Sequence, residues 1–203
     1  MSVRPYRGVQ PADRLAQRRR RLLDAGLDIL SSDPAALTVR GICARAGVAA
    51  RYFYESFSDK DEFVAAVFDA VSAEIATTTQ AAMAAAPPDE QTRAGVANIV
   101  RTISGDPRIG RLLFSPDVAN AVLLRRRAES GAVFAMLSGQ YVGTTLNLEE
   151  NDRIRATGHF VVGGMAQAIS AWLAGVVSLT PEELVDQLAA ILNELGDPAL
   201  YRS

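Results

Sequence analysis

The residues best suited to binding chemistry lie between Thr38 and Lys60, in the segment TVRGICARAGVAARYFYESFSDK. The pattern predicts two short helices, over about residues 39–46 and 50–56. A tight turn at Gly47 joins them, at a place where a chain leaving a helix often needs positive φ. Two helices that cross steeply around a glycine turn form a helix-turn-helix motif, whose second helix can enter the major groove of DNA. The segment therefore predicts recognition of a duplex.

The apolar side chains of this segment are expected to form a core and to leave the polar ones outside. We expect these side chains to face inward: Val39, Ile42, Cys43, Val48, Phe53 and Phe57. The second helix then presents Arg51, Tyr52 and Tyr54 on its other faces. Cys43 is interpreted as a small core residue, since no adjacent base or second thiol favours reactivity.

The segment resembles the DNA-binding domain of the TetR family of transcriptional regulators. The family pattern is Thr-Val, Ile-Ala, Ala-Gly-Val, aromatic-Tyr, Phe and Lys. Its counterparts here are Thr38-Val39, Ile42-Cys43, Ala46-Gly47-Val48, Phe53-Tyr54, Phe57 and Lys60. Cys43 replaces the usual Ala, and Ala49 stands where the family often has a Ser or Thr that caps the recognition helix. Beyond residue 80 the resemblance is one of architecture only.

The resemblance implies that three residues hold the DNA backbone. Thr38 and the start of its helix would bind a phosphate, since a helix N-terminus offers free N–H groups and a positive dipole. Tyr54 would donate its hydroxyl to a phosphate, and Lys60 would bind the backbone as a point charge. The alternative for Tyr54 is a core position, because Tyr often buries its ring.

The resemblance also implies which residues read the bases. Arg51 and Tyr52, early in the recognition helix, would contact base edges, and Arg40 would contact a base or a phosphate. A solvated surface position remains the alternative for both arginines. Direct phosphate contact and a solvated face are equally open for the run Arg18–Arg21. The basic N-terminal arm, with Arg4 and Arg7, is expected to be flexible and to enter a minor groove.

The charge is distributed unevenly along the 203 residues. The net charge is −2, but residues 1–60 carry +5 and residues 61–203 carry −7. The acidic remainder should repel the phosphate backbone and leave the first 60 residues as the surface that DNA accepts. We therefore expect a DNA-binding domain over 1–60 and a second domain over 61–203.

Several function classes find little support in the sequence. With one Cys and one His, neither an intramolecular disulfide nor a zinc site of the usual kind can form, and no metal or cofactor is expected. No phosphate-binding glycine loop or nucleophile elbow is present, so a helical enzyme is a weak alternative. The uncharged run 160–179 is long enough to span a bilayer, but its three glycines and lack of basic flanks favour a buried helix. The expected location is cytoplasmic, because no secretion signal precedes Gln17.

Helical periodicity predicts an all-α fold of about nine helices. Helices are expected over 12–30 and from Ser58 to about Met83. Further starts are predicted at Asp106-Pro107, Ser115-Pro116 and Thr180-Pro181, where proline occupies the first helical position.

Small and apolar stripes in the last third of the chain predict a homodimer. One stripe is Gly164, Ala168, Ala171 and Gly175, and the other includes Leu184, Leu188 and Ile191. Together they could form a four-helix bundle from two chains, because small residues let helices approach closely. The alternative is that both stripes pack inside one chain.

The second domain is expected to bind a small-molecule effector between its helices, as the resemblance implies. The candidate lining residues are Met136, Tyr141, His159 and Trp172. Met136 and Tyr141 could equally be ordinary core residues, and a structural position is favoured for His159 and Trp172. The expectation is a homodimeric, ligand-responsive regulator, a repressor released from a palindromic operator by a hydrophobic effector. A helical enzyme and a membrane-anchored protein are the alternatives.

Overall fold

The computed structural model describes residues 11–33, 36–115, 117–118 and 120–201, with only the backbone for residues 11 and 12. Nine α-helices, one short 3-10 helix and no strand occur in these ranges, so the predicted all-α class is confirmed. The chain divides into two compact units, Met1–Val67 and Phe68–Ser203. Arg4 and Arg7 of the expected arm lie outside the described residues.

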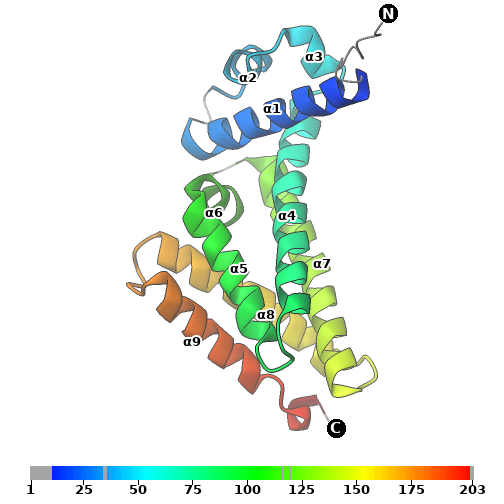
Figure 1. Cartoon of the computed structure of the whole chain (residues 1–203), viewed down its shortest axis with the longest axis vertical. Helices are drawn as coiled ribbons and strands as arrows, with labels where there is room; N and C mark the ends of the chain where they lie inside the picture. Colours follow the sequence, from blue (N-terminus) through cyan, green and yellow to red (C-terminus); the bar gives the residue numbers. More distant parts are fainter. Residues whose placement is uncertain (1–10, 34–35, 116, 119, 202–203) are drawn as a thin grey trace, which may run out of the picture. The chain divides into compact units, whose positions relative to one another are not determined.

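The first unit contains three helices and the beginning of a fourth. They are α1 (Pro11–Ser32), α2 (Val39–Ala46), α3 (Ala50–Tyr54) and the first turns of α4 (Lys60–Ala85). Figure 1 shows α2 and α3 lying together against α1. The bounds of α2 agree with the prediction, and α3 is shorter than expected.

An aromatic cluster forms the centre of the first unit. The rings of Phe53, Phe57 and Phe63 lie with their centroids 5.0–5.5 Å apart, and none of the three is more than 2% exposed. Gly26 brings α1 against this cluster, because a Cβ there would lie 2.6 Å from atoms of Phe63 and Val67. These contacts give α2 and α3 a rigid support.

The start of α4 differs from the prediction by one capping position. The helix begins at Lys60, and Asp59 accepts a hydrogen bond from the Glu62 N–H at 2.8 Å. The Glu62 carboxylate in turn accepts from the backbone and hydroxyl of Ser58, at 2.7 and 2.6 Å. Asp59 is therefore the capping residue of α4, one position after the predicted start at Ser58.

The second unit consists of the remaining helices. After α4 come α5 (Gln91–Gly105), α6 (Pro107–Phe114), α7 (Ala121–Leu146), α8 (Asp152–Leu173), α9 (Pro181–Glu194) and η2 (Pro198–Tyr201). Within this unit α7 and α8 pack side by side, and α9 lies along α5 (Figure 1).

Two of the three predicted proline starts are confirmed. The Asp106 carboxylate accepts from the Arg108 N–H at the start of α6, and Thr180 with Glu183 forms a complete capping box at the start of α9. The third predicted start, at Ser115-Pro116, is wrong. Helix α7 begins at Ala121, where the Asn120 side chain accepts from two N–H groups, and Pro116 lies outside the described residues.

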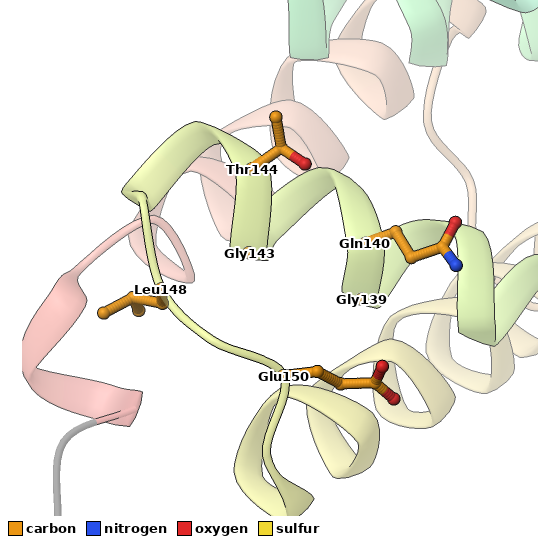
Figure 2. Close-up of a pocket in the computed structure, with 6 residues that line it drawn as sticks. All are labelled: Gly139, Gln140, Gly143, Thr144, Leu148 and Glu150. Atoms are coloured by element: carbon orange, nitrogen blue, oxygen red, sulfur yellow. The ribbon is translucent and has the colours of Figure 1, made fainter.

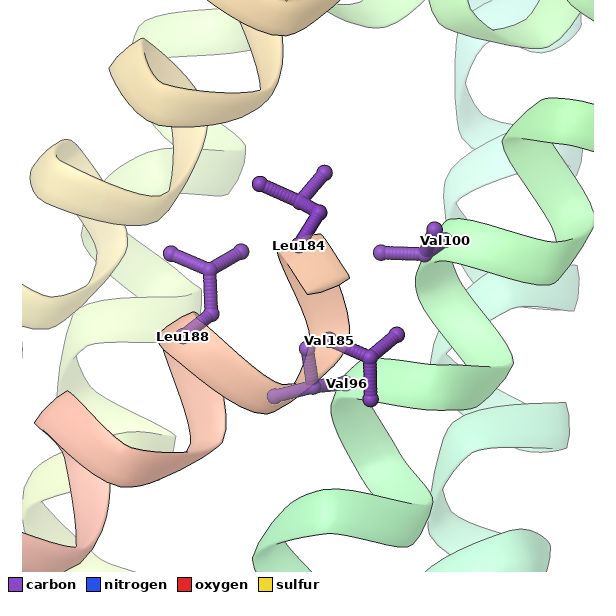
Figure 3. Close-up of a cluster of buried hydrophobic side chains, with 5 residues drawn as sticks. All are labelled: Val96, Val100, Leu184, Val185 and Leu188. Atoms are coloured by element: carbon purple, nitrogen blue, oxygen red, sulfur yellow. The ribbon is translucent and has the colours of Figure 1, made fainter. Parts of the chain in front are cut away.

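Two residues predicted for a dimer interface lie in the core of the protomer instead. Leu184 and Leu188 of α9 are 2% and 7% exposed, and they pack with Val96 and Val100 of α5. Figure 3 shows Val100 of α5 directed into the gap between the two helices, where the side chain of Leu184 lies. The apolar stripe of α9 is thus used inside one chain, which was the alternative that the sequence left open. Ile191, the third predicted residue of the stripe and about one turn beyond Leu188, is 45% exposed.

Close helix approach does occur in this unit, at glycines other than those predicted. Helix α8 crosses α7 with Gly158 against the carbonyl oxygen of Ala135, and no side chain would fit between them. Gly164, by contrast, faces open space. Gly175 is not on the α8 face at all, because the helix ends at Leu173 and Gly175 adopts φ 73° in the following turn.

Among the described residues, no helix is long and apolar enough to cross a membrane. The uncharged run 160–179 is divided between α8 and the turn that follows it.

Candidate nucleic-acid interface

The beginning of α2 forms the first part of the candidate interface. Thr38 has an extended backbone, and its hydroxyl accepts a hydrogen bond from the Gly41 N–H at 3.0 Å. The ammonium of Lys60 donates to the Leu37 carbonyl at 3.5 Å. A cation therefore lies beside a helix N-terminus on an exposed surface, which is an arrangement that favours an anion such as a phosphate.

The turn between α2 and α3 has the geometry that its sequence predicted. Gly47 adopts φ 64° and ψ 39°, the left-handed region, and its N–H donates to the end of α2. The Val48 N–H also donates to the Cys43 carbonyl at 3.0 Å. Ala49 caps α3 without a side-chain hydrogen bond. The position of α3 thus depends on the turn and on its buried face.

Helix α3 buries one aromatic ring and exposes its neighbour. Phe53 is fully buried, whereas Tyr54 is 63% exposed, so the core alternative for Tyr54 is excluded. Arg40 and Arg51 are exposed as well. The side chains with suitable chemistry for DNA therefore lie on the surface of the first unit.

Tyr52 is the centre of a small cluster that the sequence did not reveal. The guanidinium carbons of Arg18 and Arg51 lie 4.3 and 4.7 Å from the centre of its ring. Arg51 also donates to the Tyr52 hydroxyl at 2.7 Å, and this hydrogen bond raises the pKa of the Arg51 guanidinium. Glu55 forms an ion pair with Arg18 at 3.8 Å.

The basic run of α1 was predicted to contact phosphate or to be solvated, and two of its members pack on aromatic rings. Arg18 lies on Tyr52, and the guanidinium of Arg19 lies 4.7 Å from the centre of the Phe57 ring. Arg20 and Arg21 are exposed. The only available sequence signal was a basic helix preceding an aromatic motif, and it does not specify which arginine meets which ring.

The four candidate effector residues do not surround one cavity. Met136 and His159 line a shallow groove between α7 and α8. Tyr141 donates its hydroxyl to Gln91 at 3.2 Å. Trp172 donates to the Leu179 carbonyl at 2.8 Å and packs against the core between α5 and α9, so the structure gives it a packing role.

A second hollow, of about 180 Å³, lies at the turn that joins α7 to α8. Figure 2 shows Gln140 and Glu150 directed to the same side of it. Gly139, Gly143, Thr144 and Leu148 complete its lining. Neither hollow reaches the roughly 300–1,000 Å³ of a typical small-molecule pocket. Within the described ranges, no group of three His, Cys, Asp or Glu residues could hold a metal ion.

An exposed, basic helix-turn-helix on a compact helical support, followed by a larger helical unit, defines a DNA-binding protein of two helical domains. Residues 22–67 match the sequence model of bacterial regulatory proteins of the tetR family, which identifies the N-terminal domain as the DNA-binding domain of that family.

Solved structures show the same fold over most of the chain. A tetR-family regulator from Syntrophomonas wolfei has 15% identity and a TM-score of 0.72, over 89% of this chain and 95% of that one. A transcriptional regulator from Pseudomonas aeruginosa PAO1 has 18% identity and a TM-score of 0.70, over 96% and 95%. The FadR regulator of Bacillus subtilis, in complex with stearoyl-CoA, has 14% identity and a TM-score of 0.66, over 85% and 96%. None of the curated protein sequences matches the chain.

Proposed function

We propose that this protein is a homodimeric, ligand-responsive transcriptional regulator that represses genes by binding a palindromic operator in the cytoplasm. The observation that carries the proposal is the exposure of Thr38 and Lys60 at the start of α2 and of Tyr54 at the end of α3. A hydroxyl and an ammonium at a helix N-terminus, with an exposed phenol on the recognition helix, offer hydrogen-bond donors and positive charge to the DNA backbone. The net charge of +5 over residues 1–60 adds electrostatic attraction.

We place the dimer interface on the outer faces of α7 and α8. Large apolar side chains are exposed there: Val133, Met136, Leu137 and Phe160 are 51%, 53%, 48% and 65% exposed. Gly163 and Gly164 on the same helix as Phe160 face open space, which leaves room for a close partner helix. Exposed apolar side chains on two packed helices favour a self-complementary contact. Leu184 and Leu188 have no part in this interface, because they are buried in the protomer.

The proposed effector is a small hydrophobic molecule that binds within the second unit. The similarity to FadR, whose structure holds stearoyl-CoA, supports an apolar ligand. Because the two hollows at α7 and α8 are smaller than a typical small-molecule pocket, binding in either of them requires that these helices move apart. Helix α4 begins in the first unit and continues into the second, so it can carry such a movement to the DNA-binding domain.

A catalytic role is the weaker candidate. The lone His159 is exposed and forms part of a shallow groove beside Arg155. A single histidine without a nucleophile or metal partner offers little acid–base chemistry. Substrate turnover that is abolished by His159→Ala would support an enzyme instead.

The experiment that tests the proposal is a titration of fluorescent DNA from the region upstream of the protein's own gene. We expect the full-length protein to bind this DNA, and Lys60→Gln to weaken binding. Arg153→Gln is the matched control, because it removes an exposed positive charge from the second unit. Equal losses of DNA affinity in Lys60→Gln and Arg153→Gln, or no DNA binding by a folded wild-type dimer, would contradict the proposal.

A further inference from the structure

The cluster around Tyr52 joins two helices that are separate in sequence. Arg18 belongs to α1, and Arg51, Tyr52 and Glu55 belong to α3 and its C-cap. The Arg18 guanidinium lies over the Tyr52 ring at 4.3 Å, and the Tyr52 hydroxyl accepts from Arg51 at 2.7 Å. The contacts therefore form a chain from α1 through Tyr52 to Arg51.

Ring contact, more than hydrogen bonding, holds Arg18 in place. Its side chain is 27% exposed, and its Nε is buried without a hydrogen-bond partner among the described residues. Its ion pair with Glu55 is long, at 3.8 Å. Four residues further along α1, Leu22 is fully buried and fixes the helix. The guanidinium is thus a firmly supported surface for the tyrosine ring.

The cluster concentrates positive charge at the start of the recognition helix. Two guanidinium groups lie against one ring, and Glu55 offsets only part of their repulsion. A free Arg51 would sample many rotamers, whereas the hydrogen bond to Tyr52 limits them before any ligand arrives. Pre-ordering of long side chains reduces the entropy that binding must otherwise overcome.

We propose that Arg18, although it lies outside the recognition helix, is a specificity-determining residue that positions Tyr52 and, through Tyr52, Arg51 for reading base pairs. This inference rests on the proposed DNA-binding function. It distinguishes Arg18 from the exposed Arg20 of the same helix, which would add only charge. A residue that positions base-reading side chains alters discrimination between sequences, whereas a phosphate contact alters affinity for all sequences alike.

The test uses the full-length protein and a duplex that the wild type selects from a random pool, with a panel of its single base-pair variants. Dissociation constants are measured at two salt concentrations for the wild type, Arg18→Ala, Arg18→Lys, Tyr52→Ala, Arg18→Ala with Tyr52→Ala, and Arg20→Ala. Thermal unfolding confirms that each variant is folded. Arg18→Lys keeps the charge without the planar group, and Arg20→Ala removes an exposed charge from the same helix.

We expect both Arg18 variants to reduce the discrimination between the selected duplex and its single base-pair variants by about two- to five-fold. The reduction should occur at the base pairs where Tyr52→Ala also reduces discrimination. Adding Arg18→Ala to Tyr52→Ala should cause no further loss of discrimination. Arg20→Ala should weaken binding to all duplexes by the same factor. It should also reduce the slope of log affinity against log salt concentration by about one. The inference is wrong, while the proposed function stands, if Arg18→Ala weakens binding to all duplexes alike, as Arg20→Ala does. It is also wrong if the double variant loses discrimination by the product of the two single effects. If the folded wild type selects no duplex, both fail.

Discussion

Phe53 and Tyr54 are consecutive residues whose rings meet edge to face at 5.4 Å, yet one is fully buried and the other is 63% exposed. The pair fixes the orientation of α3, because Phe53 anchors the helix in the aromatic cluster and leaves the Tyr54 hydroxyl outside. One residue therefore supports the fold and its neighbour is available to a ligand.

This separation predicts opposite effects for two substitutions. Tyr54→Phe removes an exposed hydroxyl, so we expect unchanged thermal stability and a loss of about 1.5 kcal/mol, roughly ten-fold, in DNA affinity. Phe53→Ala should destabilise the domain by about 3–5 kcal/mol through the cavity that it creates. Melting curves and DNA titrations distinguish the two. Undiminished DNA binding by a folded Tyr54→Phe protein would remove Tyr54 from the interface.

The crossing of α7 and α8 predicts a second pair of outcomes. Gly158→Ala places a methyl group against the carbonyl of Ala135, so the two helices must separate, and we expect a clear loss of stability of about 1–3 kcal/mol. Gly131→Ala, in α7, meets open space and should stabilise the protein by up to about 1 kcal/mol. Chemical denaturation measures both. A Gly158→Ala protein as stable as the wild type would show that the helices are not so closely packed.

The capping carboxylates predict how stability depends on pH. Hydrogen bonds from Ser58 lower the pKa of Glu62, and those from Thr180 lower the pKa of Glu183, from an ordinary value of 4.5. A carboxylate whose pKa is lower in the folded state stabilises the fold above the unfolded pKa. This stabilisation is lost as the pH falls below about 4.5, toward the lower folded pKa.

Glu62→Gln and Glu183→Gln should therefore lower stability at neutral pH and flatten its dependence on pH between about 5 and 3. Urea denaturation at a series of pH values measures this slope. Glu182→Gln is the control, since Glu182 lies in the same first turn of α9 but is not the capping-box residue. An unchanged slope in the Glu62 and Glu183 variants, relative to the control, would contradict the capping roles.

The proposed dimer face can be distinguished from the one that the sequence suggested. Phe160→Glu places a charge on the outer face of α8, so we expect monomers at concentrations where the wild type is dimeric, and weaker DNA binding in consequence. Ile191→Glu changes an exposed apolar residue of α9 and should leave the dimer intact. Light scattering after size-exclusion chromatography measures the mass. The reverse pattern would assign the interface to α9.

Local patterns were sufficient to predict several helix boundaries and the buried aromatic residues that support the candidate interface. The Gly47 turn, the caps at Asp106 and Thr180, and the burial of Phe53 and Phe57 all follow from single residues or short spacings. The Ser115-Pro116 start failed because Asn120, five positions further on, offers the stronger cap.

Features that depend on tertiary packing could not be predicted in this way. A stripe such as that of α9 indicates which side chains are apolar but not whether the partner is α5 or a second chain. Likewise, a glycine in a helix signals a close approach only when the opposing helix is known, as at Gly158. The stacking of Arg18 on Tyr52 joins residues 34 positions apart and has no local signature.

The most direct test of the account is selection of binding sites from a random duplex pool by the full-length protein, followed by measurement of the mass of the complex. We predict one enriched sequence with two-fold symmetry, whose half-sites lie about one helical turn, or 34–36 Å, apart and bind one dimer. Affinity for that duplex should fall steeply as salt rises. Enrichment of no sequence by a folded protein, or equal affinity for every duplex, would contradict the account.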